Sequence, residues 1–218
     1  MTLLCLSDIH GEAAGLREIL SDASGIDAVV VAGDITHLGG HAEAEAVLAP
    51  LAASGIRMLA VAGNMDHEGV RQLLGERGID IHARGITIGT VGFMGLGGGT
   101  PSPFGTPWEL SDEEARGYLA TGLAAISDAP YKVLVSHAPP RDTKIDRSFA
   151  GLHFGSGAVK EFLLSGSIGL CISGHIHEAP GEDKVGSCLC VNLGPFKNGR
   201  YALITITDDG PHVTWRKK

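Results

Sequence analysis

The chain has 218 residues, of which 44% are apolar and 19% are charged, and its formal net charge is −8. These values are typical of a globular protein, and the length predicts one domain, residues 1–218, with a sizeable core. Because the one run of basic residues is the tail Arg216–Lys218, we expect no nucleic-acid partner, whose phosphates would require clustered cations.

The first part of the chain alternates apolar runs with helical patterns. Strands are predicted over Thr2–Leu6, Ala28–Ala32, Arg57–Ala62 and Gly89–Leu96. Helices are predicted with Leu16, Ile19 and Leu20 on one face, over His41–Ser54 and over Glu68–Arg77. Continuous apolar strands separated by helices predict a parallel sheet that is covered on both faces.

The second part begins with a glycine- and proline-rich loop, Gly97–Pro107, that precedes a helix. Ser111 and Glu114 have the spacing of a capping box, so this helix is predicted to begin after Ser111. The later elements predicted are strands over Tyr131–Ser136 and Leu170–Ser173, a helix over Val159–Leu164, and short strands from Asp183 to Trp215 with turns at Asn198–Gly199 and Asp209–Gly210.

Polar clusters follow five of the predicted strands. They contain Asp8 and His10, Asp34, Asn64, His137, and His175 with His177. Because ligands bind at the carboxyl ends of the strands in an open parallel sheet, we expect these side chains to meet in one pocket. Glycine is also abundant, with 32 residues, and the glycines beside these clusters allow the sharp turns that a site at strand ends requires.

The seven side chains have the chemistry of metal ligands. Two Asp, one Asn and four His suit manganese, iron, zinc or nickel, and they differ from the all-oxygen ligands of calcium. Seven side chains exceed the needs of one tetrahedral ion and suit two ions that share a carboxylate. A Gly-Asp pair after a strand is by itself only a turn signal, so the prediction depends on the ordered set of five clusters.

The series Asp8-x-His10, Gly33-Asp34, Gly63-Asn64, Ser136-His137 and Gly174-His175-x-His177 resembles the calcineurin-like metallophosphoesterase superfamily. It is most similar to small bacterial and archaeal members whose third motif is Gly-Asn-x-Asp. The resemblance implies an α/β fold, a four-layer α-β-β-α sandwich of two mixed β-sheets flanked by helices. It also implies one metal held by Asp8, His10 and His177, a second held by Asn64, His137 and His175, and Asp34 as the bridge.

The same resemblance implies an activity. A phosphodiester or phosphomonoester would be hydrolysed by attack of a metal-bridging hydroxide, with Asp34 and Asn64 among the catalytic residues. Manganese is the favoured metal, with iron, nickel, zinc or magnesium as alternatives. The expected partner is a small phosphorylated substrate, such as a nucleotide or a cyclic nucleotide.

The third motif departs from its commonest form, because Met65 stands where most members have a histidine. Methionine cannot donate a proton to a leaving group. His67 and His37 are the predicted substitutes, and Asp66 is expected to orient the Asn64 loop or to cap the next helix. The loss of the usual histidine favours diesters or esters with good leaving groups.

Three further residues are candidates for substrate binding. Arg141, in the loop after His137, has the chemistry to contact a phosphate. Phe104, in the Gly97–Pro107 loop, has the aromatic ring to stack on a nucleobase or aryl group. His153 precedes a predicted helix and is expected to line the pocket, although a structural role is also compatible with the sequence.

Other functions stay open at this stage. A non-catalytic protein-binding module on the same fold and a nuclease are the main alternatives. A single-metal peptidase or deaminase is not indicated, because the chain lacks both H-E-x-x-H and H-x-E with C-x-x-C. No apolar run reaches the length of a membrane span and no signal-peptide pattern is seen, so we expect a cytoplasmic protein that forms no membrane contact. Whether it forms a homo-oligomer stays open.

Overall fold

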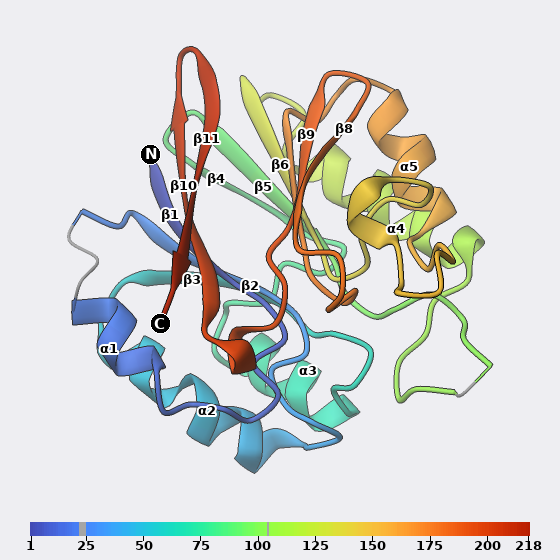
Figure 1. Cartoon of the computed structure of the whole chain (residues 1–218). Helices are drawn as coiled ribbons and strands as arrows, with labels where there is room; N and C mark the ends of the chain where they lie inside the picture. Colours follow the sequence, from blue (N-terminus) through green and yellow to red (C-terminus); the bar gives the residue numbers. More distant parts are fainter. Residues whose placement is uncertain (22–24, 104) are drawn as a thin grey trace.

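Two β-sheets lie face to face, and helices cover their outer sides (Figure 1). The computed structural model describes residues 1–21, 25–103 and 105–218. Layer by layer, it contains helices, the first sheet, the second sheet and helices again. The four-layer α-β-β-α sandwich predicted from the sequence is therefore confirmed.

The first sheet has the strand order β11-β10-β1-β2-β3. Its strands are β1 (Thr2–Leu6), β2 (Ala28–Ala32), β3 (Arg57–Val61), β10 (Arg200–Thr207) and β11 (Gly210–Lys217). The first three strands are parallel, and β10 and β11 extend the sheet as an antiparallel hairpin beside β1. The C-terminal segment of the chain thus completes the sheet that the N-terminal segment begins.

The second sheet has the order β4-β5-β6-β7-β9-β8. Its strands are β4 (Gly85–Ile88), β5 (Val91–Leu96), β6 (Tyr131–Ser136), β7 (Leu170–Ser173), β8 (Gly181–Val185) and β9 (Cys188–Asn192). The four central strands are parallel, and β4 and β8 pair antiparallel at the two edges. Both sheets are therefore mixed, with parallel strands at the centre.

The helices are divided between the outer faces (Figure 1). Those on the first sheet are α1 (Leu16–Ser21), α2 (His41–Ala53) and α3 (Glu68–Glu76), and those on the second are α4 (Asp112–Ala125) and α5 (Gly157–Leu164). The predicted capping box of Ser111 and Glu114 begins α4. Across the described ranges, none of the helices combines the length and apolarity needed to cross a bilayer.

Because side chains alternate along a strand, one strand packs against the helices on one face and against the other sheet on the opposite face. In β1, Leu4 and Leu6 pack under α1 and α2, whereas Leu3 and Cys5 point into the space between the sheets. There they join Phe93 and other residues of the second sheet, all completely buried. Successive side chains on a strand point to opposite faces, so an apolar run without alternation is buried on both sides.

Four predicted strands, β1, β2, β6 and β7, have the bounds that the sequence indicates. The strand predicted from Gly89 begins instead at Val91, because Gly89 turns the β4–β5 hairpin with a φ of 61°. Strand β4 was not predicted, since it is a short, partly exposed edge strand. The turn predicted at Asp209–Gly210 is shifted by one residue, and Gly210 opens β11.

A ring cluster supports the loop that follows β5. His82 lies edge-on against Trp108 and Tyr118, with ring centroids 4.9 and 4.5 Å apart. Its Nδ1 accepts a hydrogen bond of 3.0 Å from the backbone N–H of Gly97. Burial lowers the pKa of His82 from 6.5 to about 4, and the positive charge of Arg71 adds to this effect. The ring therefore stays neutral at neutral pH.

This shift predicts a pH dependence of stability. The unfolded chain takes up a proton below pH 6.5, but the folded His82 does so only near pH 4. Folding stability should therefore fall between those pH values, by about 2–3 kcal/mol from this group. His82→Asn keeps an acceptor for Gly97 but does not titrate, so it should lose less stability between pH 8 and pH 4.5.

Urea unfolding with a chelator present, at both pH values, measures the difference between the two proteins. The chelator removes the pH dependence that bound metal would add. An equal loss of stability in wild type and variant would contradict the assignment to His82.

Candidate metal centre

The five polar clusters meet where the parallel strands of both sheets end. Backbone N–H of Gly174 donates to the carbonyl oxygen of His137, at 3.1 Å, and joins the ends of β6 and β7. Backbone N–H of His175 donates to both carboxylate oxygens of Asp8, at 3.0 and 3.2 Å. His137 Nδ1 lies 2.8 Å from the carbonyl oxygen of Ala32. These contacts tie the two sheets together at the site.

Several of these residues have unusual backbone conformations. Asp8, His10, Asp34 and His175 have φ angles of 53°, 49°, 50° and 68°. This left-handed region is unfavourable for residues other than glycine and costs on the order of 1 kcal/mol each. Hydrogen bonds from Asp8 N–H to Gly33, at 3.0 Å, and from His10 N–H to Asp34, at 2.9 Å, hold the turns in place. Such strain is typical of functional sites.

One group of ligand-competent atoms involves Asp8, His10 and His177, whose ligand atoms lie within 4.8 Å of one another. His177 Nε2 is 3.1 Å from Asp8 Oδ1 and 3.2 Å from His10 Nε2. The buried Nδ1 of His10 has no hydrogen-bond partner in the described part of the chain. Contacts with the rings of His177 and His37 therefore orient His10, and its Nε2 faces the other two ligand atoms.

A second group involves Asp8, Asp34 and His137. His137 Nε2 lies 3.4 Å from Asp34 Oδ1 and 2.9 Å from Asn64 Oδ1. The other oxygen of Asp34, Oδ2, lies 3.8 Å from His10 Nε2. The two oxygens of Asp34 thus face different groups of histidines, which is the arrangement that a bridging carboxylate requires.

His175 completes the predicted set. Its ring packs edge-on against His137, with centroids 5.0 Å apart. Neither three-residue group includes His175, since its ring nitrogens do not lie within 4.8 Å of all the atoms of either group. All seven side chains nevertheless line one site, and six of them bring a ligand-competent atom within 4 Å of another member.

The two carboxylates are buried and charged. Burial acts to raise the pKa of Asp8, but the hydrogen bond with His177 and the charge of His137 keep it well below its usual range. Burial likewise opposes ionisation of Asp34, and the charge and hydrogen bond of His137 outweigh it, so the pKa of Asp34 is lowered. Two adjacent carboxylates that are buried away from solvent need positive charge beside them.

The histidines supply little of that charge. Burial lowers the pKa of His175 to about 4, and it also lowers the pKa of His10 despite the nearby carboxylates. For His137, burial acts in the same direction, but the charge of Asp34 raises its pKa to about 9. Of these three rings only His137 favours the protonated form, and it faces two carboxylates. This donor set fits divalent cations.

The tautomer of His137 supports the same conclusion. Its Nδ1 faces the carbonyl oxygen of Ala32, so Nδ1 carries a proton. Once the other proton leaves, the lone pair of Nε2 is directed at Asn64 and Asp34. A ligand histidine whose second nitrogen bonds a carbonyl oxygen is a common way to fix the orientation of a metal ligand.

Asp66 orients the loops around the site, which was one of the two roles predicted for it. It is completely buried and accepts hydrogen bonds from the N–H groups of Gly63, Ile35 and Thr36, at 2.8, 3.1 and 2.8 Å. Burial and the charge of Asp34 raise its pKa to about 6. The helix-capping alternative is wrong, because α3 has His67 at its N-cap and no side-chain cap.

The two histidines predicted to replace the missing motif residue differ in position. His37 is exposed, and its ring lies edge-on against His10, with centroids 5.4 Å apart. The next residue, Leu38, donates its N–H to the carbonyl oxygen of Met65, at 3.1 Å. His67 is exposed at the start of α3, and no ring contact joins it to the described ligands. His37 is therefore the better placed of the two.

The predicted substrate-binding residues have different outcomes. Arg141 and His153 line one cavity, of about 400 Å³, together with Thr100. Phe104 lies outside the described residues. These assignments stay predictions, since no bound molecule tests them.

Sequence analysis missed Lys197. It follows β9, and its backbone N–H lies 3.4 Å from the carbonyl oxygen of Asp8. Burial is the main cause of the lowered pKa of His10, and the charge of Lys197 adds to it, which places the ammonium group within electrostatic reach of the site. No local signal marked this lysine, because its position depends on where the end of β9 meets β1.

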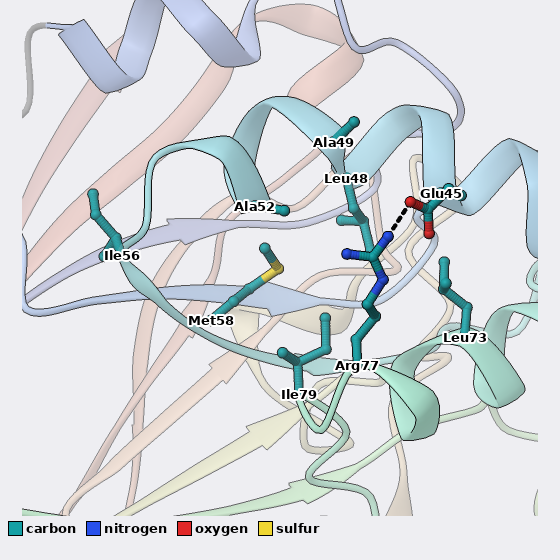
Figure 2. Close-up of a pocket in the computed structure, with 9 residues that line it drawn as sticks. All are labelled: Glu45, Leu48, Ala49, Ala52, Ile56, Met58, Leu73, Arg77 and Ile79. Carbon is teal, nitrogen blue, oxygen red and sulfur yellow. Dashed lines mark hydrogen bonds and ion pairs between the residues drawn. The ribbon is translucent and has the colours of Figure 1, made fainter.

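A different cavity, of about 300 Å³, lies between α2 and α3 (Figure 2). Its wall is mostly apolar, with Met58, Ile79 and Leu73 among the side chains, and an ion pair of Arg77 with Glu45 crosses it. Met58 lies at the beginning of β3, whereas the metal-competent residues follow the strand ends. This cavity is therefore not part of the candidate centre.

Comparison with known proteins places these features in context. The model of the calcineurin-like phosphoesterase family matches residues 1–179. MJ1162, an uncharacterized protein of Methanocaldococcus jannaschii, is 33% identical over 200 residues, which cover 89% of this chain and 88% of the relative.

Two solved structures show the same fold. The protein TT1561 of Thermus thermophilus matches with a TM-score of 0.75 and 18% identity, over 98% of this chain and 97% of its own. The sulfate thiohydrolase SoxB of Thermus thermophilus has a TM-score of 0.62 and 17% identity, over 99% of this chain and 56% of its own. At these identities the likeness concerns the fold alone.

The tight packing at Gly174 makes a prediction. A Cβ there would lie 1.7 Å from Ser7 Oγ and 2.3 Å from Asp8 Oδ2. Gly174→Ala should displace Asp8, destabilise the protein by about 1–3 kcal/mol and at least halve its metal content. Elemental analysis after equilibration with Mn²⁺ and urea unfolding measure the two effects.

Gly117→Ala is the matched control. Gly117 is exposed in α4, and a Cβ there would meet nothing within 4 Å. This variant should keep its metal and gain about 0.5–1 kcal/mol of helix stability. Full metal content in both variants would show that Asp8 is not needed for binding.

Proposed function

The chain belongs to the calcineurin-like phosphoesterase family, and from this membership we propose that it is a metal-dependent hydrolase of phosphoric esters. Its substrates are small phosphodiesters or phosphomonoesters, and two divalent ions, manganese first among them, act in the site. The observation that carries the proposal is the position of Asp34. Its two oxygens face His137 and His10, at 3.4 and 3.8 Å, and so separate two ligand groups.

Each ion would have its own ligands. Asp8, His10 and His177 hold one, and Asn64, His137 and His175 hold the other. When bound, two such ions supply a hydroxide nucleophile at neutral pH and positive charge beside the phosphoryl oxygens. The protein fixes the ligand geometry, since every ligand follows a buried strand and the loops are joined through Asp66.

Other residues act on the substrate itself. We assign to Lys197 the attraction of the negatively charged ester, because its backbone N–H lies 3.4 Å from the carbonyl oxygen of Asp8 and its side chain carries a positive charge. To His37 we assign a hydrogen bond to the leaving oxygen, because it lies against His10 and its neighbour Leu38 bonds to Met65. In this arrangement the exposed imidazole of His37, in the loop after β2, replaces the proton donor that most members of the family have at the position of Met65.

The alternatives have weaker support. A protein-binding module would tolerate the loss of ligands, but all seven predicted positions carry ligand-competent side chains, and five of them form the two groups of close ligand atoms. A nuclease is disfavoured by the net charge of −8, since polyanion binding requires a basic surface.

The first test is Asp34→Asn. Loss of the bridging charge should reduce kcat for bis(p-nitrophenyl) phosphate and p-nitrophenyl phosphate by about 10²-fold or more, whether Mn²⁺, Ni²⁺ or Mg²⁺ is supplied. Glu161→Gln, which removes a carboxylate from a surface ion pair with Arg116, is the control and should leave the rate unchanged. Hydrolysis by the Asp34 variant at the wild-type rate would refute the proposal.

The second test concerns His37. His37→Asn should slow phenyl phosphate, which has a poor leaving group, about tenfold, and should change the rate with p-nitrophenyl phosphate little. His67→Asn is the matched control, since His67 is exposed and lacks the contact with His10. If both esters slow equally in the His37 variant, the group does not act on the leaving oxygen.

A further inference from the structure

A cavity adjoins the Asn64 side of the centre. Its volume is about 400 Å³, and Thr100, Arg141 and His153 belong to its wall. Thr100 follows Gly99, which packs so closely on Asn64 that a Cβ on it would lie 2.8 Å from the Cβ of Asn64. The wall of the cavity is therefore joined to a predicted metal ligand through Gly99, the residue that precedes Thr100.

Arg141 is an unpaired cation in this wall. No hydrogen bond or ion pair of its guanidinium is found in the described ranges. The hydrogen bond with Lys160 is the main cause of the lowered pKa of the neighbouring Asp142, the charge of Arg141 adds to it, and one carboxylate, Asp112, also belongs to the wall. Asp142 pairs with Lys160, at 3.1 Å, and Asp112 accepts a hydrogen bond from the N–H of Ala158, at 3.1 Å, where α5 begins. The guanidinium is thus free to bind an anion from solution.

His153 is a second polar residue of the wall, and its ring has a fixed orientation. Its Nδ1 lies 2.6 Å from Oδ1 of Asp146. Asp146 is completely buried and also accepts hydrogen bonds from the N–H groups of Asp142, Thr143 and Gly155, at 3.0, 2.9 and 3.1 Å. Because Nδ1 is bound on the Asp146 side, Nε2 is the nitrogen left for a molecule in the cavity.

We propose that this cavity binds a second phosphate group of the substrate, beyond the one that is hydrolysed. Arg141 supplies a planar pair of N–H donors, which suits a phosphate. Nε2 of His153, the ring nitrogen that is not bonded to Asp146, is the atom of this ring that can contact the same phosphate. The inference rests on the proposed phosphoesterase function and narrows the substrates to small molecules that carry at least two phosphate groups.

The test uses non-hydrolysable ligands and measures binding. Alkylene diphosphonates of increasing length are compared with alkyl monophosphonates of the same length, by calorimetric titration of the Mn²⁺-loaded protein. At the length that spans both sites, the diphosphonate should bind about tenfold more tightly than the monophosphonate. Arg141→Gln and His153→Asn should each remove most of this advantage and leave the Kd of the monophosphonate unchanged.

Arg116→Gln is the control, because Arg116 is exposed on α4, pairs with Glu161 and does not belong to the cavity wall. The Arg116 variant should bind the diphosphonate more tightly than the monophosphonate by the same factor as the wild type. An unchanged Kd for the monophosphonate also shows that each variant is folded with its centre intact. The inference is overturned if no length of diphosphonate binds more tightly, if Arg141→Gln keeps the advantage, or if neither ligand binds.

These outcomes are separate from the test of the proposed function, which requires turnover. A protein that hydrolyses simple aryl phosphates but shows no diphosphonate advantage keeps the function and loses the second-phosphate site. A protein that shows the advantage but hydrolyses no ester keeps the anion site and loses the function.

Discussion

Two buried carboxylates, Asp8 and Asp34, constrain the rest of the structure. Both are ionised and nearly inaccessible to solvent, and they lie where the two sheets meet. An anion pair in this position is tolerated only with positive charge or many hydrogen-bond donors around it. The protein provides one imidazole with a raised pKa, that of His137. The backbone N–H groups of Met65 and His175 also donate hydrogen bonds to the carboxylates. The remaining deficit of charge is the physical reason to expect cations here.

The same constraint explains why glycine is abundant near the site. A Cβ on Gly33 would lie 2.4 Å from Nδ1 of His137, and one on Gly63 would lie 2.1 Å from Oδ1 of Asp34. Side chains at these positions would occupy the space of the ligands themselves. The close approach of these two loops to His137 and Asp34 therefore requires glycine at both positions. The composition reflects this geometry, because ligands from five strand ends must fit into one small volume.

Part of this arrangement follows from the sequence, and part depends on tertiary contacts. Four strands were predicted with correct bounds from apolar runs that end in polar clusters. These strands are buried on both faces, so the apolar run is continuous and its ends are easy to recognise. The edge strand β4 carries partly exposed side chains such as Ile86 and has no such signal. Lys197 and the hydrogen bonds from Ile35 and Thr36 to Asp66 lay beyond a local pattern, because each joins segments that are distant in sequence, whereas the role of Asp66 in its own loop was predicted.

The centre and the substrate-facing wall are built in different ways. Every predicted ligand follows a strand of the core, so its position is as rigid as the sheets. The wall comes from two loops and the start of α4, and each loop folds around one carboxylate. Asp146 collects the N–H groups of its loop, and Glu109 accepts from Ser102 and Thr106 at 2.9 Å. Because hydrogen bonds to these carboxylates stabilise the loops, substitutions of their outward-facing side chains need not disturb the centre. Family membership therefore concerns the residues at the strand ends, and the proposed second-phosphate site depends on the loops.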